Sequence, residues 1–484
     1  MADVNDPQRR FRLSADLRGS GRWFLLSAIV GVVAGFGAIT FHFCTQVVSH
    51  YVLANLTGYV APEPAGEHVL FAPPVAKTLS PWWILAVITA GGLVSGLIVF
   101  TFAPEAEGHG TDAVIDAFHY NEGRMRARIP LVKLVASAIT IGTGGSAGRE
   151  GPIAQIGAGF GSLLGGWLKL SPHDRRILLA AGMGAGIGSI FRAPLAGAIF
   201  AAEILYSEAD IETEVIVPAM ISSVIAFLVF SFSLPPELRF VPLFGAGLQF
   251  HLVSPRELVP LALVACVLVV VSIAYINCFY GTMKLFKCLP GPPHIRPAVG
   301  SALAGILALA TFFAAGQNEQ ALAVLSSGYG ALQHALMNPA SLGVGLLLTI
   351  ALVKIVTTSL TIGSGGSGGV FGPSIVIGGC LSAAIGNFLH GHWPNFVRQP
   401  EIYGIVGMAG FFAGCAHAPI STIIMVSEIT GDYQLLLPTM WVSTICFLLN
   451  RRWTLYIKQV PTRMDSPAHR DESAAGTAEA LPRI

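Results

Sequence analysis

The chain has 484 residues, of which 53% are hydrophobic and only 11% charged, and its formal net charge is +1. Its mean hydropathy is +0.66. This composition excludes an ordinary soluble domain and predicts a multi-pass helical membrane protein. A nearly neutral chain without a basic stripe also gives no reason to expect a nucleic-acid partner.

A basic arm at residues 1–22 precedes the first apolar segment, and a polar tail at 461–484 ends the chain. Basic residues flank the apolar region on both sides: Arg9, Arg10, Arg12, Arg18 and Arg22 before it, and Arg451, Arg452, Lys458 and Arg463 after it. By the positive-inside rule, both termini are predicted to be cytoplasmic.

Charge-free runs of about membrane length follow one another between these ends. They cover residues 23–49, 82–103, 215–236, 258–283, 297–318, 332–353, 372–397, 402–427 and 433–450. Shorter apolar segments, several interrupted by glycine, lie at 108–118, 129–148, 151–168, 177–191 and 193–205. Broken segments are typical of transport sites, because irregular backbone at membrane depth survives only where it is buried or lines a cavity.

One carboxylate, that of Glu150, lies in the glycine-rich stretch TGGSAGREGPIAQIG at 143–157. A carboxylate at membrane depth costs several kcal/mol unless it is paired or solvated, so it indicates function. Gly151-Pro152 is well suited to opening a helix. A helix that begins inside a membrane directs unpaired N–H groups and a positive dipole end at that point, which favours an anion site without a fixed cation.

The same pattern occurs twice in the chain. Glu150 and Pro152 align with Phe371 and Pro373, since 371 − 150 and 373 − 152 both give 221. A second pair of segments aligns Pro194 with Pro419 and Glu203 with Glu428, since 419 − 194 and 428 − 203 both give 225. The repeat predicts two pseudo-symmetric halves, at about 23–236 and 255–460, with a substrate site between them.

Other classes of function have weaker support. Ser146 and Ser367 each fit the G-x-S-x-G pattern of a serine nucleophile, but such a serine should follow a strand and one active site does not need two. We therefore expect no enzyme. The seven cysteines are scattered singly and no His/Cys ligand spacing occurs, so neither a metal site nor a cofactor is expected.

Four motifs carry a resemblance to a known family. They are Gly148-Arg149-Glu150-Gly151-Pro152, Gly369-Val370-Phe371-Gly372-Pro373, Ala193-Pro194-Leu195-Ala196-Gly197 and Leu455-Tyr456. Together they resemble the CLC family of chloride channels and proton-coupled chloride transporters, over about residues 25–465.

The resemblance implies an all-α fold of two inverted-topology repeats with tilted and broken helices, here at 23–460. It also implies a homodimer with one pore per subunit, in the inner membrane of the cell. The implied activity is exchange of chloride for protons, driven by their gradients. The short tail favours a prokaryotic-like member without the paired cytoplasmic nucleotide-sensing (CBS) domains of many relatives.

The resemblance also assigns roles to single residues. Glu150 corresponds to the gating glutamate, which takes up and releases the proton. The anion site corresponds to His109, Gly110, Val370, Phe371 and Tyr456. Arg149 and Lys133 correspond to basic residues that concentrate anions at the mouth.

Two departures leave alternatives open. His109 takes the place of the family's usual serine, so nitrate or fluoride remains an alternative to chloride. Ile204 takes the place of the internal glutamate of proton-coupled members, so a passive chloride channel remains an alternative to exchange. Glu203 is a candidate for the proton path, and equally a structural carboxylate bonded to nearby backbone.

Overall fold

The computed structural model describes residues 7–72, 78–245, 250, 252, 254–337 and 342–469. The predicted all-helical membrane fold is confirmed, with seventeen α-helices in the described residues. The first half contains α1 (Pro7–Val48), α2 (Asn55–Thr57), α3 (Pro81–Phe102), α4 (Thr111–Tyr120), α5 (Arg128–Gly142), α6 (Glu150–Trp167), α7 (Pro172–Ile190), α8 (Pro194–Glu203) and α9 (Thr213–Phe232).

The second half contains α10 (Leu258–Cys288), α11 (Arg296–Ala314), α12 (Tyr329–Met337), α13 (Gly343–Gly363), α14 (Phe371–His392), α15 (Glu401–Ala416), α16 (Pro419–Thr430) and α17 (Leu436–Leu449). Short π and 3₁₀ segments join them: η1 (Ser49–Ala54), η2 (Pro104–Ala106), η3 (Pro236–Leu238), η4 (Pro255–Glu257), η5 (Pro293–Ile295), η6 (Glu319–Val324), η7 (Arg463–Asp465) and η8 (Pro467–His469).

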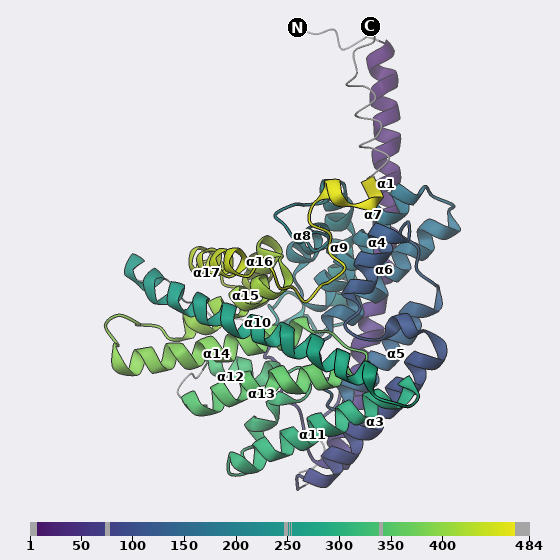
Figure 1. Cartoon of the computed structure of the whole chain (residues 1–484). Coiled ribbons are helices and arrows are strands. Elements are labelled where there is room, and N and C mark those ends of the chain that lie inside the picture. The colour runs from purple at the N-terminus through teal and green to yellow at the C-terminus, as the bar shows by residue number, and fades with distance from the viewer. Residues whose placement is uncertain are drawn as a thin grey trace.

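Seven helical stretches among the described residues are long and apolar enough to cross a membrane. They are Gly21–Thr57, Pro81–Phe102, Thr213–Phe232, Pro255–Cys288, Pro293–Ala314, Gly343–Gly363 and Phe371–His392. The long helices differ in direction, since α10 runs at a steep angle to α1 (Figure 1). The helices therefore differ in length and tilt, and they do not form a simple parallel bundle.

Two of the charge-free runs are not single spans. The run at 402–427 breaks between α15 and α16, where His417 adopts a left-handed conformation with φ of 57° and Pro419 opens the next helix. The first half turns in the same way at Arg192, also with φ of 57°, before Pro194. The run at 332–353 is divided between the end of α12 and the start of α13. Absence of charge marks apolar surroundings, whereas proline and the left-handed residue decide where a helix ends.

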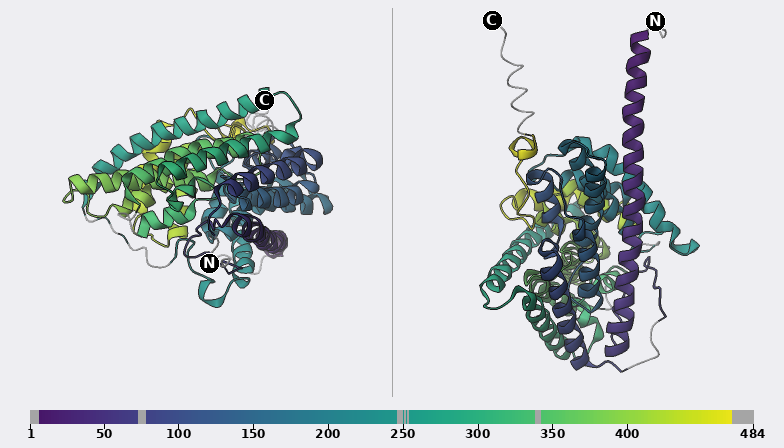
Figure 2. Two further views of the ribbon diagram at one scale, coloured as in Figure 1. Left: turned by 90° about the horizontal axis from the view of Figure 1, so that it is seen from below. Right: turned by 90° about the vertical axis from the view of Figure 1, so that its right-hand side faces the viewer.

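The two halves lie side by side (Figures 1 and 2). Backbone hydrogen bonds join their glycine-rich loops. Gly148 N–H donates to the Gly369 carbonyl at 2.7 Å, and Gly369 N–H donates back to the Gly148 carbonyl at 2.7 Å. The loop before α4 joins them, because Gly108 N–H donates to the Gly366 carbonyl at 3.1 Å. The starts of α4, α6 and α14 are thereby brought together at the centre of the molecule.

The first turns of α7 contact both α1, at Arg22, and the end of the described chain. Arg22 of α1 lies 3.5 Å from Asp174, and Arg176 donates to the Ala468 carbonyl at 3.1 Å. The beginning of α1 and residues 463–469 accordingly lie on one side of the molecule (Figure 1). Helix α1 takes in residues 7–22 of the predicted arm, while most of the predicted tail lies outside the described residues.

Candidate functional site

Glu150 is the first residue of α6, and its side chain is buried. The Tyr329 hydroxyl donates a hydrogen bond to its Oε1 atom. The other oxygen, Oε2, has no partner among the described groups. The carboxylate lies so close to the loop backbone that a side chain at Gly148 would overlap it, and a Cβ at Gly369 would lie 2.9 Å from Oε2. The glycines therefore let the carboxylate sit against the paired loops.

A small cavity, which we call the central cavity, lies next to this carboxylate. Its volume is about 10 Å³, close to the least space that holds one water molecule. It is lined by Thr111, Glu150, Ile187, Phe191, Phe200, Phe371, Met425 and Tyr456. Three of the predicted site residues, Glu150, Phe371 and Tyr456, thus line one space, which is apolar except for the carboxylate and two hydroxyls.

The helix starts give the central cavity its electrostatic character. Helix α6 begins at Glu150 and α14 at Phe371, with Val370 as the residue that precedes the first turn. Unpaired N–H groups and the positive dipole ends of both helices are concentrated there. Such an arrangement binds a weakly hydrated anion without a fixed cation, and an ionised carboxylate is itself an anion that can occupy it.

His109 lies in a different space. It lines a cavity of about 270 Å³, here called the His109 cavity, together with Gly110 and charged residues of both signs: Lys287, Arg296, Glu107 and Asp112. The ring packs edge-on to Tyr456 with 5.3 Å between centroids. Thr111, two residues further on, reaches the central cavity where the His109 ring does not. The direct contribution of this loop to the central cavity is therefore a threonine.

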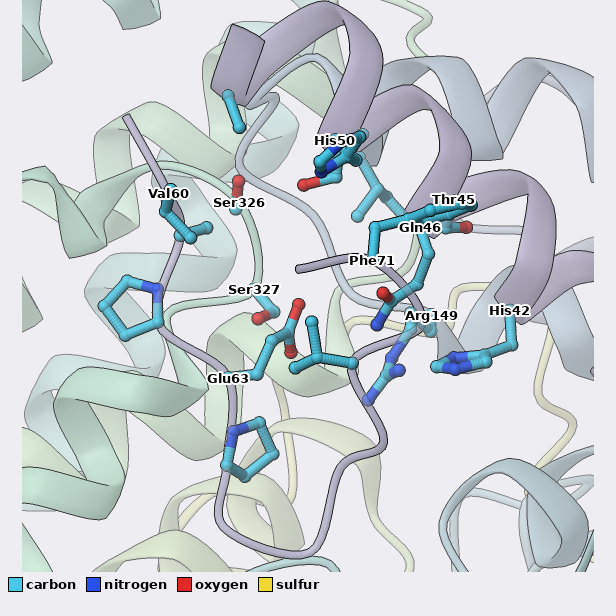
Figure 3. A pocket seen from close by; sticks show the side chains of 18 residues that line it. His42, Thr45, Gln46, His50, Val60, Glu63, Phe71, Arg149, Ser326 and Ser327 are labelled. Atoms are coloured by element: carbon cyan, nitrogen blue, oxygen red, sulfur yellow. The ribbon is translucent and has the colours of Figure 1, made fainter. Parts of the chain in front are cut away.

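Arg149 lies in a third space, the Arg149 cavity, of about 360 Å³. Figure 3 shows Arg149 and Glu63 reaching into it, with His42 on one side and Ser326 and Ser327 on the other. The cavity lies between the end of α1 with η1, the loop that follows them, and the segment before α12. Because Arg149 lines this cavity and its neighbour Glu150 lines the central cavity, the first residues of α6 separate the two.

The charge of Arg149 is matched by Glu67, on the loop that follows α2. The two side chains form a bidentate pair with both distances 2.9 Å, and His42 Nδ1 lies 3.1 Å from the same carboxylate. Burial alone would raise the pKa of Glu67, but the Arg149 charge and hydrogen bonds, with His42, outweigh it and lower the pKa to about 2. This pair fastens the loop over the start of α6.

Lys133 is fully buried and forms hydrogen bonds with backbone carbonyls. Its Nζ donates to the carbonyls of Ala106 at 3.1 Å and Gly108 at 2.7 Å, just before α4. Lys354, its counterpart in the second half since 354 − 133 gives 221, donates in the same way to carbonyls of residues 323–326 before α12. Both lysines therefore hold the loop that precedes a short helix, and a further effect of Lys133 or Arg149 on anions in the mouth stays a prediction.

Glu203 and Ile204 lie at the end of α8. Both oxygens of Glu203 accept backbone N–H groups at the start of α16, from Ile420 at 2.9 Å and Ser421 at 2.7 Å. This geometry favours the structural alternative for Glu203. Ile204 is fully buried, and its carbonyl accepts a hydrogen bond from Gln459 at 3.1 Å.

The two serines of the G-x-S-x-G pattern are bound within structural networks. The Ser146 hydroxyl lies 2.9 Å from that of Thr358, and Ser367 donates to the Ala106 carbonyl at 2.9 Å. Both serines follow a helix and precede another, instead of standing after a strand. The geometry of a nucleophile elbow is therefore not the geometry of these loops.

Three residues of the site were missed from the sequence: Thr111, Tyr329 and Glu67. A signal existed for two of them. Gly328-Tyr329 repeats Gly110-Thr111 at a constant offset, since 328 − 110 and 329 − 111 both give 218, and each pair opens a short helix. Glu67 carried no signal, because it lies in a loop and meets its partner only in the folded chain.

Comparisons with known proteins agree with this architecture. The family model for the voltage gated chloride channel matches residues 91–451, most of the chain. A ClcB-like chloride channel protein of Ralstonia nicotianae is 30% identical, over 86% of this chain and 90% of that protein. The H⁺/Cl⁻ exchange transporter ClcA of Yersinia pestis is 27% identical, over 86% of this chain and 81% of that protein.

The fold is also that of a solved transporter. A slow cyanobacterial Cl⁻/H⁺ antiporter superposes with a TM-score of 0.73 at 20% identity, covering 95% of this chain and 99% of the other. Fold and site thus define a multi-pass integral membrane protein of the transport class. The chain belongs to the CLC family, whose model it matches over most of its length.

Proposed function

We propose that this protein is a secondary transporter that exchanges chloride for protons through a path gated by Glu150. One observation carries the proposal: the Glu150 carboxylate stands between the facing starts of α6 and α14 and borders the central cavity. When ionised, it occupies the position that favours an anion; when protonated, it loses that attraction and can leave. The same group therefore accepts the proton and gives way to chloride.

The remaining site residues have two roles, which are to bind the anion and to form its approach. The Tyr456 hydroxyl and the backbone N–H groups of Val370 and Phe371 are suited to donate to chloride in the central cavity. Gly110 and His109 line the His109 cavity, on the other side of Tyr456 from the central cavity. They form the path by which the anion approaches the central cavity from that side. Because the central cavity is too small for chloride beside the ionised carboxylate, we infer that Glu150 must move before the anion passes.

The two larger cavities are suited to be the entrances of the path. We assign the Arg149 cavity to the outer face and the His109 cavity to the cytoplasmic face of an inner membrane. Arg22, in the predicted basic arm, and Ala468, at the end of the described chain, both lie against α7, which supports placing both termini on one side; we assign that side to the cytoplasm. A homodimer with one path in each subunit, formed by the membrane domain at 23–460, completes the proposal.

A passive chloride channel is the second candidate, and one observation favours it. Ile204 stands fully buried where proton-coupled relatives would carry an acid, and an aliphatic side chain cannot relay a proton. Exchange would then need water or another acid between Glu150 and the cytoplasm. An exchanger for nitrate or fluoride is a third form of the same proposal, since His109 replaces the usual serine.

Reconstituted liposomes separate these candidates. Purified protein is placed in vesicles loaded with high chloride, and external chloride and external pH are recorded together after a potassium ionophore is added. Exchange predicts that external pH rises as chloride leaves, because protons are driven inward. Chloride efflux at constant pH would assign the passive channel, and replacing chloride by nitrate or fluoride in the same vesicles identifies the anion carried.

A further inference from the structure

Tyr329 holds the carboxylate of Glu150 from the opposite half of the chain. It is the first residue of α12, its side chain is fully buried, and its hydroxyl donates to Glu150 Oε1. The two residues are 179 positions apart in the sequence. A hydroxyl that donates to a carboxylate makes a charge-assisted hydrogen bond, which is stronger than a bond between neutral groups.

The position of Tyr329 is one that the fold uses twice. Gly110 and Gly328 have positive φ of 84° and 79°, and each is followed by the first residue of a short helix. Thr111 follows Gly110 and lines the central cavity together with Tyr456. Tyr329 follows Gly328 and reaches Glu150, so the inverted repeat places a hydroxyl group at the gate from each half.

The ring of Tyr329 is also held in place, by contacts with two neighbouring side chains. The Arg149 guanidinium lies 5.9 Å from the ring centroid, and Phe244 packs edge-on to the same ring at 5.9 Å. Arg149 is in turn fixed by both oxygens of Glu67. The loop after α2 thus positions Arg149, Arg149 and Phe244 position the phenol, and the phenol positions the carboxylate.

We propose that Tyr329 is a positioning residue that latches the ionised form of Glu150 beside the central cavity, an inference that rests on the proposed role of Glu150 as the gate. The hydrogen bond from the Tyr329 hydroxyl is strongest when Glu150 is ionised, because a protonated carboxyl is a weaker acceptor. Protonation therefore loosens the latch, and the carboxyl can leave the anion position. Tyr329 itself neither binds chloride nor carries the proton.

The Tyr329→Phe variant removes only the hydroxyl and keeps the ring under Arg149. Chloride flux from liposomes is measured against pH for the variant and the unmodified protein. Loss of a hydrogen bond to a charged group should raise the flux at the alkaline end about tenfold, and should move the pH of half-maximal flux upward by about one unit. A residue that only filled space would change the amount of folded protein without moving this pH profile.

Three further variants make the result decisive. Tyr403→Phe is the matched control, because Tyr403 is a buried tyrosine whose hydroxyl has no partner among the described groups, and it should leave both flux and pH profile unchanged. Glu150→Gln should abolish the pH dependence, and adding Tyr329→Phe to it should change nothing more, since the latch acts only through Glu150.

Each other outcome overturns a specific claim. An unchanged pH profile in Tyr329→Phe would refute the latch while leaving the gate intact. A gain in flux that persists in the double variant would also refute it, because the hydroxyl would then act elsewhere. If Glu150→Gln kept the original pH dependence, the assignment of Glu150 as the gate would be wrong. The role proposed for Tyr329 would then be refuted as well, because it depends on that assignment.

Discussion

Glu203 and Glu428 each cap the first turn of the helix that carries the other. Glu203, at the end of α8, accepts N–H groups from Ile420 and Ser421 of α16. Glu428, near the end of α16, accepts N–H groups from Leu195 at 3.3 Å and from Ala196 at 2.8 Å, both in α8. This reciprocal contact joins the two halves of the repeat and satisfies the orphan N–H groups of two helices that begin inside the protein.

Replacing either glutamate by alanine should therefore destabilise the fold. Glu203→Ala and Glu428→Ala should each cost about 1 kcal/mol, the usual loss for a helix cap, and lower the midpoint of thermal unfolding in detergent. Glu237→Ala, at an exposed glutamate, is the control and should unfold as the unmodified protein does. The proton-to-chloride ratio should be the same in Glu203→Ala; loss of proton movement alone would return Glu203 to the proton path.

The pair of Glu67 and Arg149 should contribute more than an exposed ion pair. Glu67→Gln leaves a buried guanidinium without its bidentate partner, and removing one member of a buried pair costs about 3 kcal/mol. Thermal unfolding in detergent measures the effect. Glu237→Gln changes an exposed carboxylate far from this pair and should have little effect. Equal unfolding temperatures for the two variants would contradict the role assigned to Glu67.

The pH dependence of this pair has a definite sign. The pKa of Glu67 is lowered to about 2 in the folded protein, against about 4.3 in an unfolded chain. A lowered carboxyl pKa contributes stability that is present above the unfolded value and is lost as pH falls toward the folded value. The difference in stability between the unmodified protein and Glu67→Gln should thus shrink as pH falls below about 4. A difference that stayed the same from pH 5 down to pH 2 would contradict the assigned pKa.

Tyr456 should contribute to anion affinity through its hydroxyl. Tyr456→Phe removes that donor from the central cavity and keeps the ring against His109. Loss of one hydrogen bond to a charged ligand predicts that Kd for chloride rises about tenfold, as measured by calorimetry. Unchanged affinity would remove Tyr456 from the anion site.

Much of the fold could be predicted from the sequence because its signals are local. Glycine-rich loops followed by proline fixed the starts of α6 and α14, and the Ala-Pro pairs fixed those of α8 and α16. The same local signals explain the correction at 402–427, where the apolar run continued but the helix did not. The absence of charge indicates that a segment lies in apolar surroundings. Proline and residues in the left-handed conformation determine where its helices begin and end.

The site could be predicted only in part, because several contacts join distant segments. Glu150, Phe371 and Tyr456 were expected together and do line one cavity. The contact of Tyr329 with Glu150 spans 179 positions, and that of Glu67 with Arg149 spans 82. Glu67 shows no motif of its own, and the repeat that includes Gly328-Tyr329 does not indicate that Tyr329 contacts Glu150. The position of His109 beside Tyr456, and not in the central cavity, likewise depends on how the loop before α4 is held by Lys133.

The central claim is that Glu150 is both gate and proton carrier, and Glu150→Gln tests it most directly. In liposomes with an outward chloride gradient, external chloride and pH are recorded for this variant beside the unmodified protein. The account predicts that the unmodified protein takes up protons as chloride leaves, whereas Glu150→Gln continues to release chloride with no movement of protons. Proton uptake that survived in Glu150→Gln would contradict the account.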